Sequence, residues 1–239
     1  MPEHQPADDP LRRLSAWLDE AHAAGLGPPD TMTLATATSD ATPAARMVLL
    51  KALDARGLVF YTNRTSRKGR ELAANPRAAL VLYWPSLGRQ ARVEGAVEEV
   101  GDEESDAYWA TRPLGSRLSA AASPQSEVVE SRAWLEARVA TLAARGDDPQ
   151  RPAHWGGYVV VPEVIEFWVH DDDRLHDRTR WTRDGDGWRA EGGHGASRSA
   201  RPRMRSGFSS PSSAHSRPWP SGRSPLSATP WRSPSRSRA

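Results

Sequence analysis

The stretch RMVLLKALDARGLVFYTNRTSRKGREL, residues 46–72, contains the only two lysines of the chain, Lys51 and Lys68. Lysine is normally a common surface residue, and arginine has replaced it everywhere else, so these two positions stand out. The apolar run within residues 46–53 predicts a strand. A second strand is expected at residues 57–61 after a short polar turn, and the two together predict a β-hairpin.

A short helix is expected directly after this hairpin. Ser66 can accept a hydrogen bond as the N-cap of a helix over residues 67–74, and Pro76 would end that helix. Arg67 and Lys68 then occupy the first turn, where positive charge opposes the helix dipole. Local stability therefore does not explain these two residues, whereas a bound anion would.

Two interpretations of this basic cluster remain open on the residues alone. The free amides of the helix start, with Arg67 and Lys68, suit a phosphate, and Arg46 and Lys51 of the hairpin could add to them. The alternative is a solvated basic face, and this stretch favours neither over the other. Arg46 and Lys51 are five residues apart, so an ideal strand would point them to opposite sides.

Composition excludes several classes of protein. The chain has no cysteine, which excludes a disulfide framework, a thiolate metal site and a cysteine nucleophile. The histidines are scattered and the acidic run at residues 171–173 lacks a calcium-loop pattern, so we expect no metal. No apolar stretch approaches the ~20 residues that span a bilayer, and the N-terminus lacks a secretory signal. We expect a cytoplasmic protein with no membrane partner.

The net charge of +2 combines an acidic body with a basic tail. From Gly192 onward the chain has nine arginines and no Asp or Glu, so residues 1–191 hold the other 23 Lys and Arg with all 30 Asp and Glu, a net charge of −7. Ser, Pro, Arg, Gly and Ala dominate the tail without apolar periodicity, which predicts disorder. We therefore expect a flexible N-terminus at 1–8, one folded domain at 9–191 and a disordered tail at 192–239.

The basic tail also permits a nucleic-acid interpretation. Its arginines could neutralise phosphates, and Trp219 and Trp231 could stack on bases. Only composition supports this interpretation, so we do not expect nucleic acid as a partner.

Periodicity along the rest of the body predicts a mainly β fold, a β-barrel core with peripheral helices. Apolar residues at helical spacing predict an amphipathic first helix, and most later segments alternate as strands do. The expected helices are residues 10–24, 102–109 and 127–144, and the expected strands are 32–38, 78–84, 91–100, 157–161 and 164–169, with a last hairpin joining 179–183 to 188–190.

Several motifs then follow one another in a fixed order. After the stretch at 46–71 come RQARVEG at 89–95, SDAYWATRPLGS at 105–116, PQS at 124–126, WGGYVVVPEVIEFW at 155–168 and RLHDR at 174–178. In this order and spacing the chain resembles the pyridoxamine 5'-phosphate oxidase family over about residues 9–190, a far more specific signal than a single short motif. The resemblance implies a split-barrel FMN-binding fold that forms a homodimer, with FMN at the subunit interface.

The resemblance also implies which residues bind the cofactor FMN. Arginines and lysines would offset the phosphate charge, amides and hydroxyls would bond polar edges, and a tryptophan would offer apolar surface. The residues carried over for FMN are Arg46, Met47, Val48, Leu49, Leu50, Lys51, Tyr61, Thr62, Arg67, Lys68, Gln90, Gln125, Ser126, Trp168 and Arg178.

For the substrate, the resemblance implies a phosphate site and a ring site. Lys51, Tyr108, Arg112 and Ser116 would bind the 5'-phosphate of pyridoxine or pyridoxamine 5'-phosphate. Arg174, Leu175 and His176 would lie over the pyridine ring, with Arg174 and His176 as the catalytic pair. Taken singly, Tyr108 could be a core aromatic, Arg112 a helix C-terminal charge and His176 a surface histidine.

The order of the RLHDR segment adds one geometric expectation. Arg174, His176 and Arg178 would share one strand face by parity, which concentrates positive charge there.

The implied reaction is hydride transfer from C4' of the substrate to the flavin, with O2 reoxidising the flavin to give pyridoxal 5'-phosphate and hydrogen peroxide. Two alternatives stay open: a non-catalytic or weakly active FMN-binding protein, and a related split-barrel oxidase or reductase acting on a phenazine precursor or a deazaflavin. The phosphate set favours the vitamin B6 substrate, because a protein that only bound cofactor would not need it.

The chain departs from the family pattern beside the expected substrate region. Val169 replaces a glutamine, the segment 170–172 replaces a more glycine-like stretch, and residues 117–119 read Arg-Leu-Ser where Gln-Ile-Gly is usual. The Arg-Leu-x-Pro ending expected soon after Trp188 is absent. An abrupt change from acidic to Arg/Ser/Pro-rich sequence is what a frame shift in a GC-rich gene would produce, a hypothesis that resequencing the 3' end would test.

Overall fold

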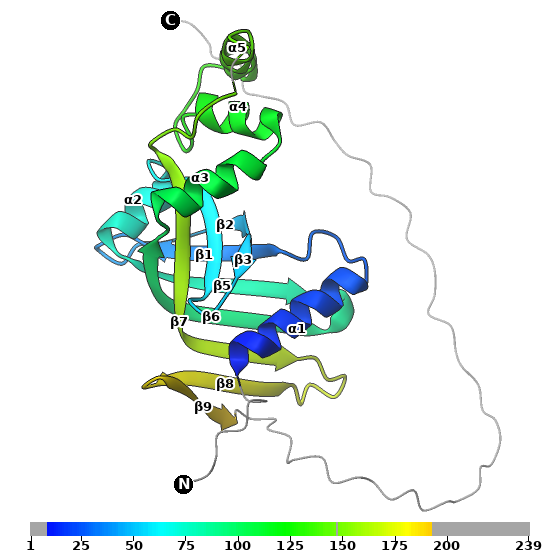
Figure 1. Cartoon of the computed structure of the whole chain (residues 1–239). Helices are drawn as coiled ribbons and strands as arrows, with labels where there is room; N and C mark the ends of the chain where they lie inside the picture. The colour runs from blue at the N-terminus through cyan, green and yellow to red at the C-terminus, as the bar shows by residue number, and fades with distance from the viewer. Residues whose placement is uncertain (1–8, 147, 193–239) are drawn as a thin grey trace, which may run out of the picture. The chain divides into compact units, whose positions relative to one another are not determined.

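The computed structural model describes residues 9–146 and 148–192, and its centre is one antiparallel sheet (Figure 1). The strand order is β2-β1-β5-β6-β7-β4-β3, with β8 paired to β7 and β9 paired to β8. The nine strands are β1 Thr31–Ala37, β2 Pro43–Leu49, β3 Ala52–Leu53, β4 Leu58–Asn63, β5 Arg77–Trp84, β6 Arg89–Glu99, β7 Trp155–Val169, β8 Asp177–Asp184 and β9 Gly187–Gly192.

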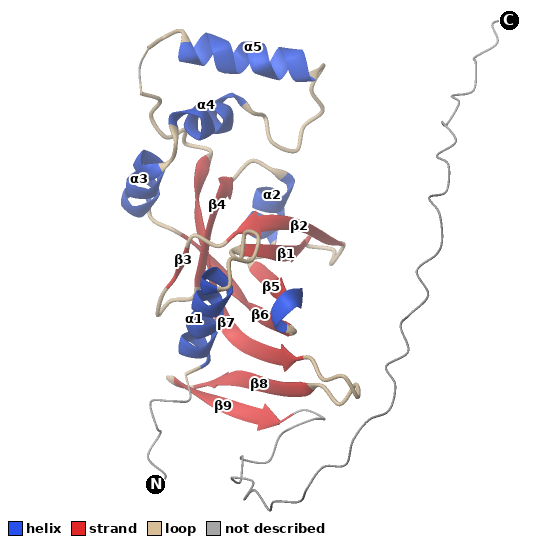
Figure 2. Cartoon of the chain, turned by 90° about the vertical axis from the view of Figure 1, so that its right-hand side faces the viewer, coloured by secondary structure: helices blue, strands red, loops and turns tan. Residues whose placement is uncertain are grey.

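Helices surround this sheet. They are α1 Pro10–Ala23, α2 Arg67–Ala74, α3 Asp102–Thr111, α4 Leu114–Ala122 and α5 Arg132–Ala143, with a 3-10 turn, η2, at Pro85–Leu87. Figure 2 shows α3, α4 and α5 gathered at one end of the sheet and β8 and β9 at the other. The sheet curls into a half-barrel, so the expected mainly β core with peripheral helices is confirmed.

Strand β7 organises the sheet because it has partners along its whole length. Its first half pairs with β4 and its second half with β8, while β6 runs beside both halves. The β6–β7 register shifts between Glu94 and Gly95, opposite Pro162. A Cβ on Gly95 would lie 1.9 Å from the Val161 carbonyl oxygen, so only glycine fits this bulge.

The two strands expected at 157–161 and 164–169 are therefore one continuous strand. The expectation of a break at Pro162 was wrong, because the missing N–H of proline falls at the bulge, where the ladder is already interrupted.

The expected hairpin at 46–61 is also much shorter than the sequence pattern indicated. All of β2 pairs with β1, and only Ala52 and Leu53 pair with β4. The chain leaves the sheet ladder between these strands at Leu50 and Lys51, where the Lys51 N–H donates to Val59 O at 2.8 Å. Since the strand is broken there, strand parity does not govern where Arg46 and Lys51 point.

The helix expected at 67–74 is confirmed with its cap. The Ser66 hydroxyl accepts a hydrogen bond from the Gly69 N–H at 3.4 Å, as an N-cap should. The first helix is also confirmed, because α1 buries Leu14, Trp17 and Leu18 in the core, where Trp17 packs edge-to-face on Phe167 at 4.9 Å.

The helical end of the domain differs from the sequence-based expectation. The helix expected at 127–144 begins only at Arg132, where Ser131 caps it by accepting from the Trp134 N–H at 3.0 Å. Helix α4 was not expected at all. The segment between α4 and α5 carries the PQS motif, and Gln125 of this motif accepts hydrogen bonds from Thr62 on β4 and from Lys68 on α2.

Among the described helices, none is long and apolar enough to cross a membrane. The expected flexible N-terminus at 1–8 lies outside the described residues, as does the expected tail apart from Gly192.

Candidate functional site

A pocket of about 240 Å³ lies where the end of β2, the end of β4, the start of α2 and helix α3 meet. We call it the cationic pocket. Ten of its eleven lining residues are ones that the sequence singled out, the exception being Trp155. Its lining residues are Met47, Val48, Leu49, Lys51, Tyr61, Thr62, Lys68, Tyr108, Arg112, Gln125 and Trp155.

A second cavity of about 690 Å³ adjoins the cationic pocket. It shares Tyr61, Thr62, Arg112, Gln125 and Trp155 with the pocket. The second cavity adds Ser116 on α4, so the four residues expected around the substrate phosphate line one continuous region.

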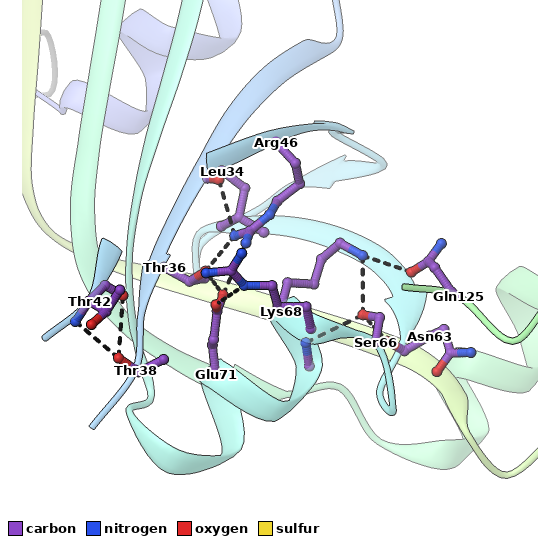
Figure 3. Close-up of polar contacts among 12 residues, drawn as sticks. Leu34, Thr36, Thr38, Thr42, Arg46, Asn63, Ser66, Lys68, Glu71 and Gln125 are labelled. Atoms are coloured by element: carbon purple, nitrogen blue, oxygen red, sulfur yellow. Dashed lines mark hydrogen bonds and ion pairs between the residues drawn. The ribbon is translucent and has the colours of Figure 1, made fainter. Parts of the chain in front are cut away.

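Lys68 is the buried cation of this region (Figure 3). Its Nζ donates to Gln125 Oε1 at 2.7 Å and to Ser66 Oγ at 3.2 Å. Burial and the nearby Arg46 guanidinium together lower the pKa of Lys68 to about 8, against the opposing effect of Glu71. A phosphate bound beside Lys68 would raise this pKa again and keep the ammonium protonated.

Glu71 holds the arginines at the edge of the pocket. Its carboxylate is buried and accepts from Arg46 Nη2 at 3.0 Å and from Arg67 Nε at 2.7 Å, with Thr36 as a third donor (Figure 3). Burial alone would raise the pKa of Glu71, but the hydrogen bonds from Thr36, Arg67 and Arg46 outweigh it and hold that pKa below the usual range.

The sequence analysis missed both Glu71 and Thr36. The Arg67–Glu71 spacing of four residues on a helix was the available signal for the first of them. Nothing local indicated Thr36, which reaches Arg46 only because β1 and β2 pair.

Three aromatic rings form the wall of the pocket. Tyr61 stacks on Tyr108 with ring centroids 4.1 Å apart and on Trp155 at 5.3 Å, at interplanar angles of 17° and 10°. Burial, with the charge of Glu104, raises the pKa of Tyr61 to about 12, so the phenol stays a neutral hydrogen-bonding group. Trp155 was missed as a site residue, although the WGG motif that contains it was noted.

Arg112 lies against this wall with an unused donor. Its guanidinium carbon is 4.8 Å from the Trp155 ring centroid, and burial lowers its pKa. Within residues 9–146 and 148–192, no acceptor lies in hydrogen-bond reach of the buried Arg112 Nη1. An unpaired buried donor is costly, so an anionic ligand in the adjoining space would supply what this guanidinium lacks.

A second group of expected site residues lies in one row across three strands. Gln90 on β6 pairs with Trp168 on β7, which pairs with Arg178 on β8. We call these three residues the far row. Arg178 donates to Glu166 at 2.8 Å.

The expected ring-binding residues lie beside the far row, in the loop between β7 and β8. Arg174, Leu175 and His176 precede β8, and Arg174 has a positive φ of 63°, so the expectation that Arg174, His176 and Arg178 share a strand face was wrong. The His176 ring centroid is 4.6 Å from that of Trp168.

Within one chain the cationic pocket and the far row do not meet. The pocket lining includes no far-row residue, and Figure 1 shows β8 at the opposite end of the sheet from α2. The Leu50 side chain is buried in the core. Ser126, with a φ of 71°, is exposed in the segment after α4.

The donors of the cationic pocket fit a phosphate-bearing cofactor such as FMN. Four features favour an anion here: the buried Arg112 Nη1, which has no hydrogen-bond partner among the described residues, the buried ammonium of Lys68, the exposed Lys51 and the free amides at the start of α2. In the described part of the chain, no group of three or more His, Asp or Glu is arranged to hold a metal ion.

Comparison with known proteins places this geometry in context. Residues 18–146 match the family described as pyridoxamine 5'-phosphate oxidase, and residues 155–192 match the pyridoxine 5'-phosphate oxidase C-terminal dimerisation region. A pyridoxine/pyridoxamine 5'-phosphate oxidase of Burkholderia multivorans is 56% identical over 183 residues, 76% of this chain and 86% of that protein. One from Thermosynechococcus vestitus is 55% identical over 187 residues, 78% of this chain and 89% of that protein.

Solved structures agree on the fold. PhzG from Burkholderia lata, solved in complex with tetrahydrophenazine-1-carboxylic acid, is 36% identical with a TM-score of 0.76, covering 81% of this chain and 96% of that one. A pyridoxamine 5'-phosphate oxidase-related FMN binding protein from Nostoc punctiforme shares the fold at 19% identity and a TM-score of 0.63, covering 77% and 96%. The chain thus has the split-barrel fold, and it belongs to the pyridoxamine 5'-phosphate oxidase family.

Proposed function

We propose that the protein is an FMN-dependent oxidase that converts pyridoxine or pyridoxamine 5'-phosphate to pyridoxal 5'-phosphate, with O2 as acceptor and hydrogen peroxide as product. With the pyridoxamine substrate, water would also be consumed and the amino group would leave as ammonia. The observation that carries the proposal is the cationic pocket, where Lys51, Tyr108 and Arg112 of the expected phosphate set adjoin the residues expected to bind FMN. Relatives 55–56% identical that bear the name of this oxidase support it.

The residues of the pocket would hold FMN mainly through its phosphate. Lys68 lies at the start of α2, and Arg46 and Arg67 are held nearby by the Glu71 carboxylate. Gln125 and Thr62, which are joined by a 3.2 Å hydrogen bond, would bind polar edges of the cofactor. Bound FMN would supply the redox chemistry, accepting hydride from C4' of the substrate and passing electrons to O2.

The substrate would be bound by its phosphate and oriented at its ring. The unpaired Arg112 Nη1, the exposed Lys51 and the hydroxyls of Tyr108 and Ser116 would complement a phosphate dianion. Arg174, Leu175 and His176 would lie over the pyridine ring and align C4' for hydride removal.

A homodimer would complete the site. The match to a C-terminal dimerisation region covers residues 155–192, which include Trp168 and Arg178 of the far row and the loop with Arg174 and His176. Because one chain keeps these residues apart from the cationic pocket, we propose that the far row and loop of a second copy close over FMN bound in the first.

The test is oxygen-dependent formation of pyridoxal 5'-phosphate by the purified chain, saturated with FMN, with the bound flavin spectrum recorded first. Turnover with pyridoxine or pyridoxamine 5'-phosphate, and none with unphosphorylated pyridoxine, is the expected result. Failure to bind FMN would overturn the whole proposal.

One alternative is an oxidase of the same fold with a phenazine precursor as substrate. The similarity to PhzG supports this alternative at a lower identity than that of the oxidase relatives. This alternative would be supported if the FMN-loaded protein oxidised a reduced phenazine carboxylate but neither pyridoxine nor pyridoxamine 5'-phosphate.

A second alternative is a non-catalytic FMN-binding protein. The absence of the Arg-Leu-x-Pro ending and the departures at residues 117–119 and 169–172 favour it. Bound flavin without turnover of any of these substrates would support this alternative.

A further inference from the structure

The loop between β7 and β8, residues 170–176, is fixed by its own hydrogen bonds. The Asp171 carbonyl accepts from the Arg174 N–H at 3.1 Å, and the Asp171 carboxylate accepts from the Asp173 N–H at 2.9 Å. Arg174 adopts a left-handed φ of 63° in this turn. The loop is therefore a defined turn that returns the chain toward Trp168.

Two successive backbone N–H groups at the start of this loop have different partners. The His170 N–H donates to Gly88 O at 2.7 Å, which ties the loop to the turn before β6. The next N–H, that of Asp171, donates to Nδ1 of His176 at 3.1 Å. The corner at His170 and Asp171 thus connects the sheet edge directly to the His176 ring.

Gly88 makes room for this corner. It has a φ of 59°, and a Cβ built there would lie 2.9 Å from the His170 Cβ. A side chain at this position would push His170 away, and the Asp171 N–H would move with it.

The rings pack together above the corner. The His170 and His176 centroids are 5.3 Å apart, and they lie 5.9 Å and 4.6 Å from the Trp168 centroid. The outer face of His170 is held by Asp172, whose Oδ1 is 3.3 Å from Nε2. The His170 ring therefore lies beside that of His176, and we expect it to limit rotation of that ring.

The hydrogen bond from Asp171 determines which nitrogen of His176 can carry a proton. A ring nitrogen that accepts a hydrogen bond has no proton of its own, so a neutral His176 must be protonated at Nε2. Its remaining nitrogen is then a donor, and the ring has no free basic nitrogen to offer a substrate.

We propose that the corner at His170 and Asp171 holds His176 as the Nε2-protonated tautomer, so that His176 acts on the substrate as a hydrogen-bond donor and not as a base. His170 is a positioning residue in this arrangement. The inference rests on the proposed function for the identity of the substrate, but the tautomer is a property of the protein alone.

The charged residues of the loop and of the strands beside it have to be considered together with the protonation of His176. Protonation of His176 would set its Nδ1–H against the Asp171 N–H and break the contact, so the arrangement holds only while the ring is neutral. The charged residues on the loop and on the strands that adjoin it are Asp171, Asp172, Asp173 and Arg174 in the loop, Arg89 on β6, Glu166 on β7, and Asp177 and Arg178 on β8.

The first test reads the tautomer directly. Long-range proton–nitrogen NMR spectra of the full chain with labelled histidine, with and without FMN, should show an unprotonated Nδ1 and a protonated Nε2 for His176, assigned by loss of its signals in His176→Gln. In His170→Ala these signals should shift toward an average of the two tautomers. His22→Ala removes another exposed histidine that is bonded to an aspartate, at 2.8 Å, and should leave them unchanged.

A proton on Nδ1 in the unmodified chain would overturn the proposal. If the His176 signals are the same in His170→Ala as in the unmodified chain, His170 does not position His176. Neither outcome depends on catalysis, so the result stands apart from the success or failure of the oxidase assay.

The second test separates donor from base by kinetics. A glutamine side chain can place an N–H donor near the position of Nε2 but cannot accept a proton, so kcat of His176→Gln should exceed that of His176→Ala by at least about tenfold if the ring donates. If His176 is a base, both variants should lose turnover alike, by roughly 10²–10⁴-fold.

Discussion

Lys68 Nζ lies 2.7 Å from Gln125 Oε1, although the two residues are 57 positions apart in the chain. This contact joins the first turn of α2 to the segment after α4 and closes one side of the cationic pocket. Both hydrogen-bond partners of this buried ammonium are neutral. Burial and Arg46 destabilise its charged form more than Glu71 stabilises it, so a bound anion would stabilise the ammonium.

Lys68→Met should weaken FMN binding while making the flavin-free protein more stable at pH 7, by on the order of 1 kcal/mol, because it removes a buried charge. The pKa of Lys68 is about 8 when folded and near its ordinary value of 10.5 when unfolded. The native state therefore binds fewer protons between these pH values, so stability should rise with pH across that window in the unmodified protein and not in the variant.

Thermal unfolding and FMN titration, each at pH 7 and pH 9, measure both effects. FMN affinity of the unmodified protein should fall at pH 9, because Lys68 then loses the charge that a phosphate needs. Arg70→Met on the exposed face of the same helix is the control, and an equal loss of FMN affinity there would contradict a specific role for Lys68.

Glu71→Gln should destabilise the domain by about 3–5 kcal/mol, because Arg46 and Arg67 lose the buried carboxylate that holds them. The pKa of Glu71 is depressed in the folded state, so its contribution to stability is present above the ordinary carboxyl pKa and is lost as the pH falls through the folded value. The acid limb of the stability profile should be shallower in the variant.

Urea unfolding between pH 3 and pH 7 measures this effect. Glu163→Gln, which breaks an exposed pair with Arg77, should change stability by less than about 1 kcal/mol. Similar losses in the two variants would contradict the role assigned to Glu71.

Gly157→Ala should move Tyr61 and so disturb the aromatic wall of the pocket. Gly157 pairs with Tyr61 across β4 and β7, and a Cβ there would lie 2.7 Å from the Tyr61 ring and 2.9 Å from Val100 Cβ. We expect a loss of about 1–3 kcal/mol in unfolding free energy together with weaker FMN binding. Gly27→Ala meets no atom within 4 Å and should leave FMN binding as it is.

Arg112→Ala should raise KM for pyridoxine 5'-phosphate by roughly 10-fold to 100-fold, the cost of one charge-assisted hydrogen bond to a phosphate. FMN should remain bound, which the flavin spectrum reports. Arg77→Ala, at an exposed ion pair, is the matched control. An unchanged KM in Arg112→Ala would remove Arg112 from the phosphate site.

Arg174→Ala should lower turnover and leave FMN bound, because we assign Arg174 to the substrate ring, whereas the cations proposed for the FMN phosphate lie at the start of α2 and on β2. Steady-state kinetics on the FMN-saturated variant measure this, and loss of FMN in step with turnover would contradict a role limited to the substrate.

Much of the fold could be predicted from local pattern. The cap at Ser66, the apolar stripe of α1 and the last hairpin each depend on neighbours in sequence, and each is present. The continuity of β7 through Pro162 and the pairing of β2 with β1 could not be predicted, because strand partners are chosen by contacts distant in the chain.

The sequence by itself determined which residues were expected at the candidate site, through the order of its motifs, and it determined the helix start that presents Lys68. Only the tertiary structure decided that Arg46 is held by Glu71, that Trp155 completes the aromatic wall, and that the far row lies away from the cationic pocket. Motif order is a property of the chain, whereas a pocket is made by side chains from separate strands and helices, and their positions follow from sheet pairing and burial.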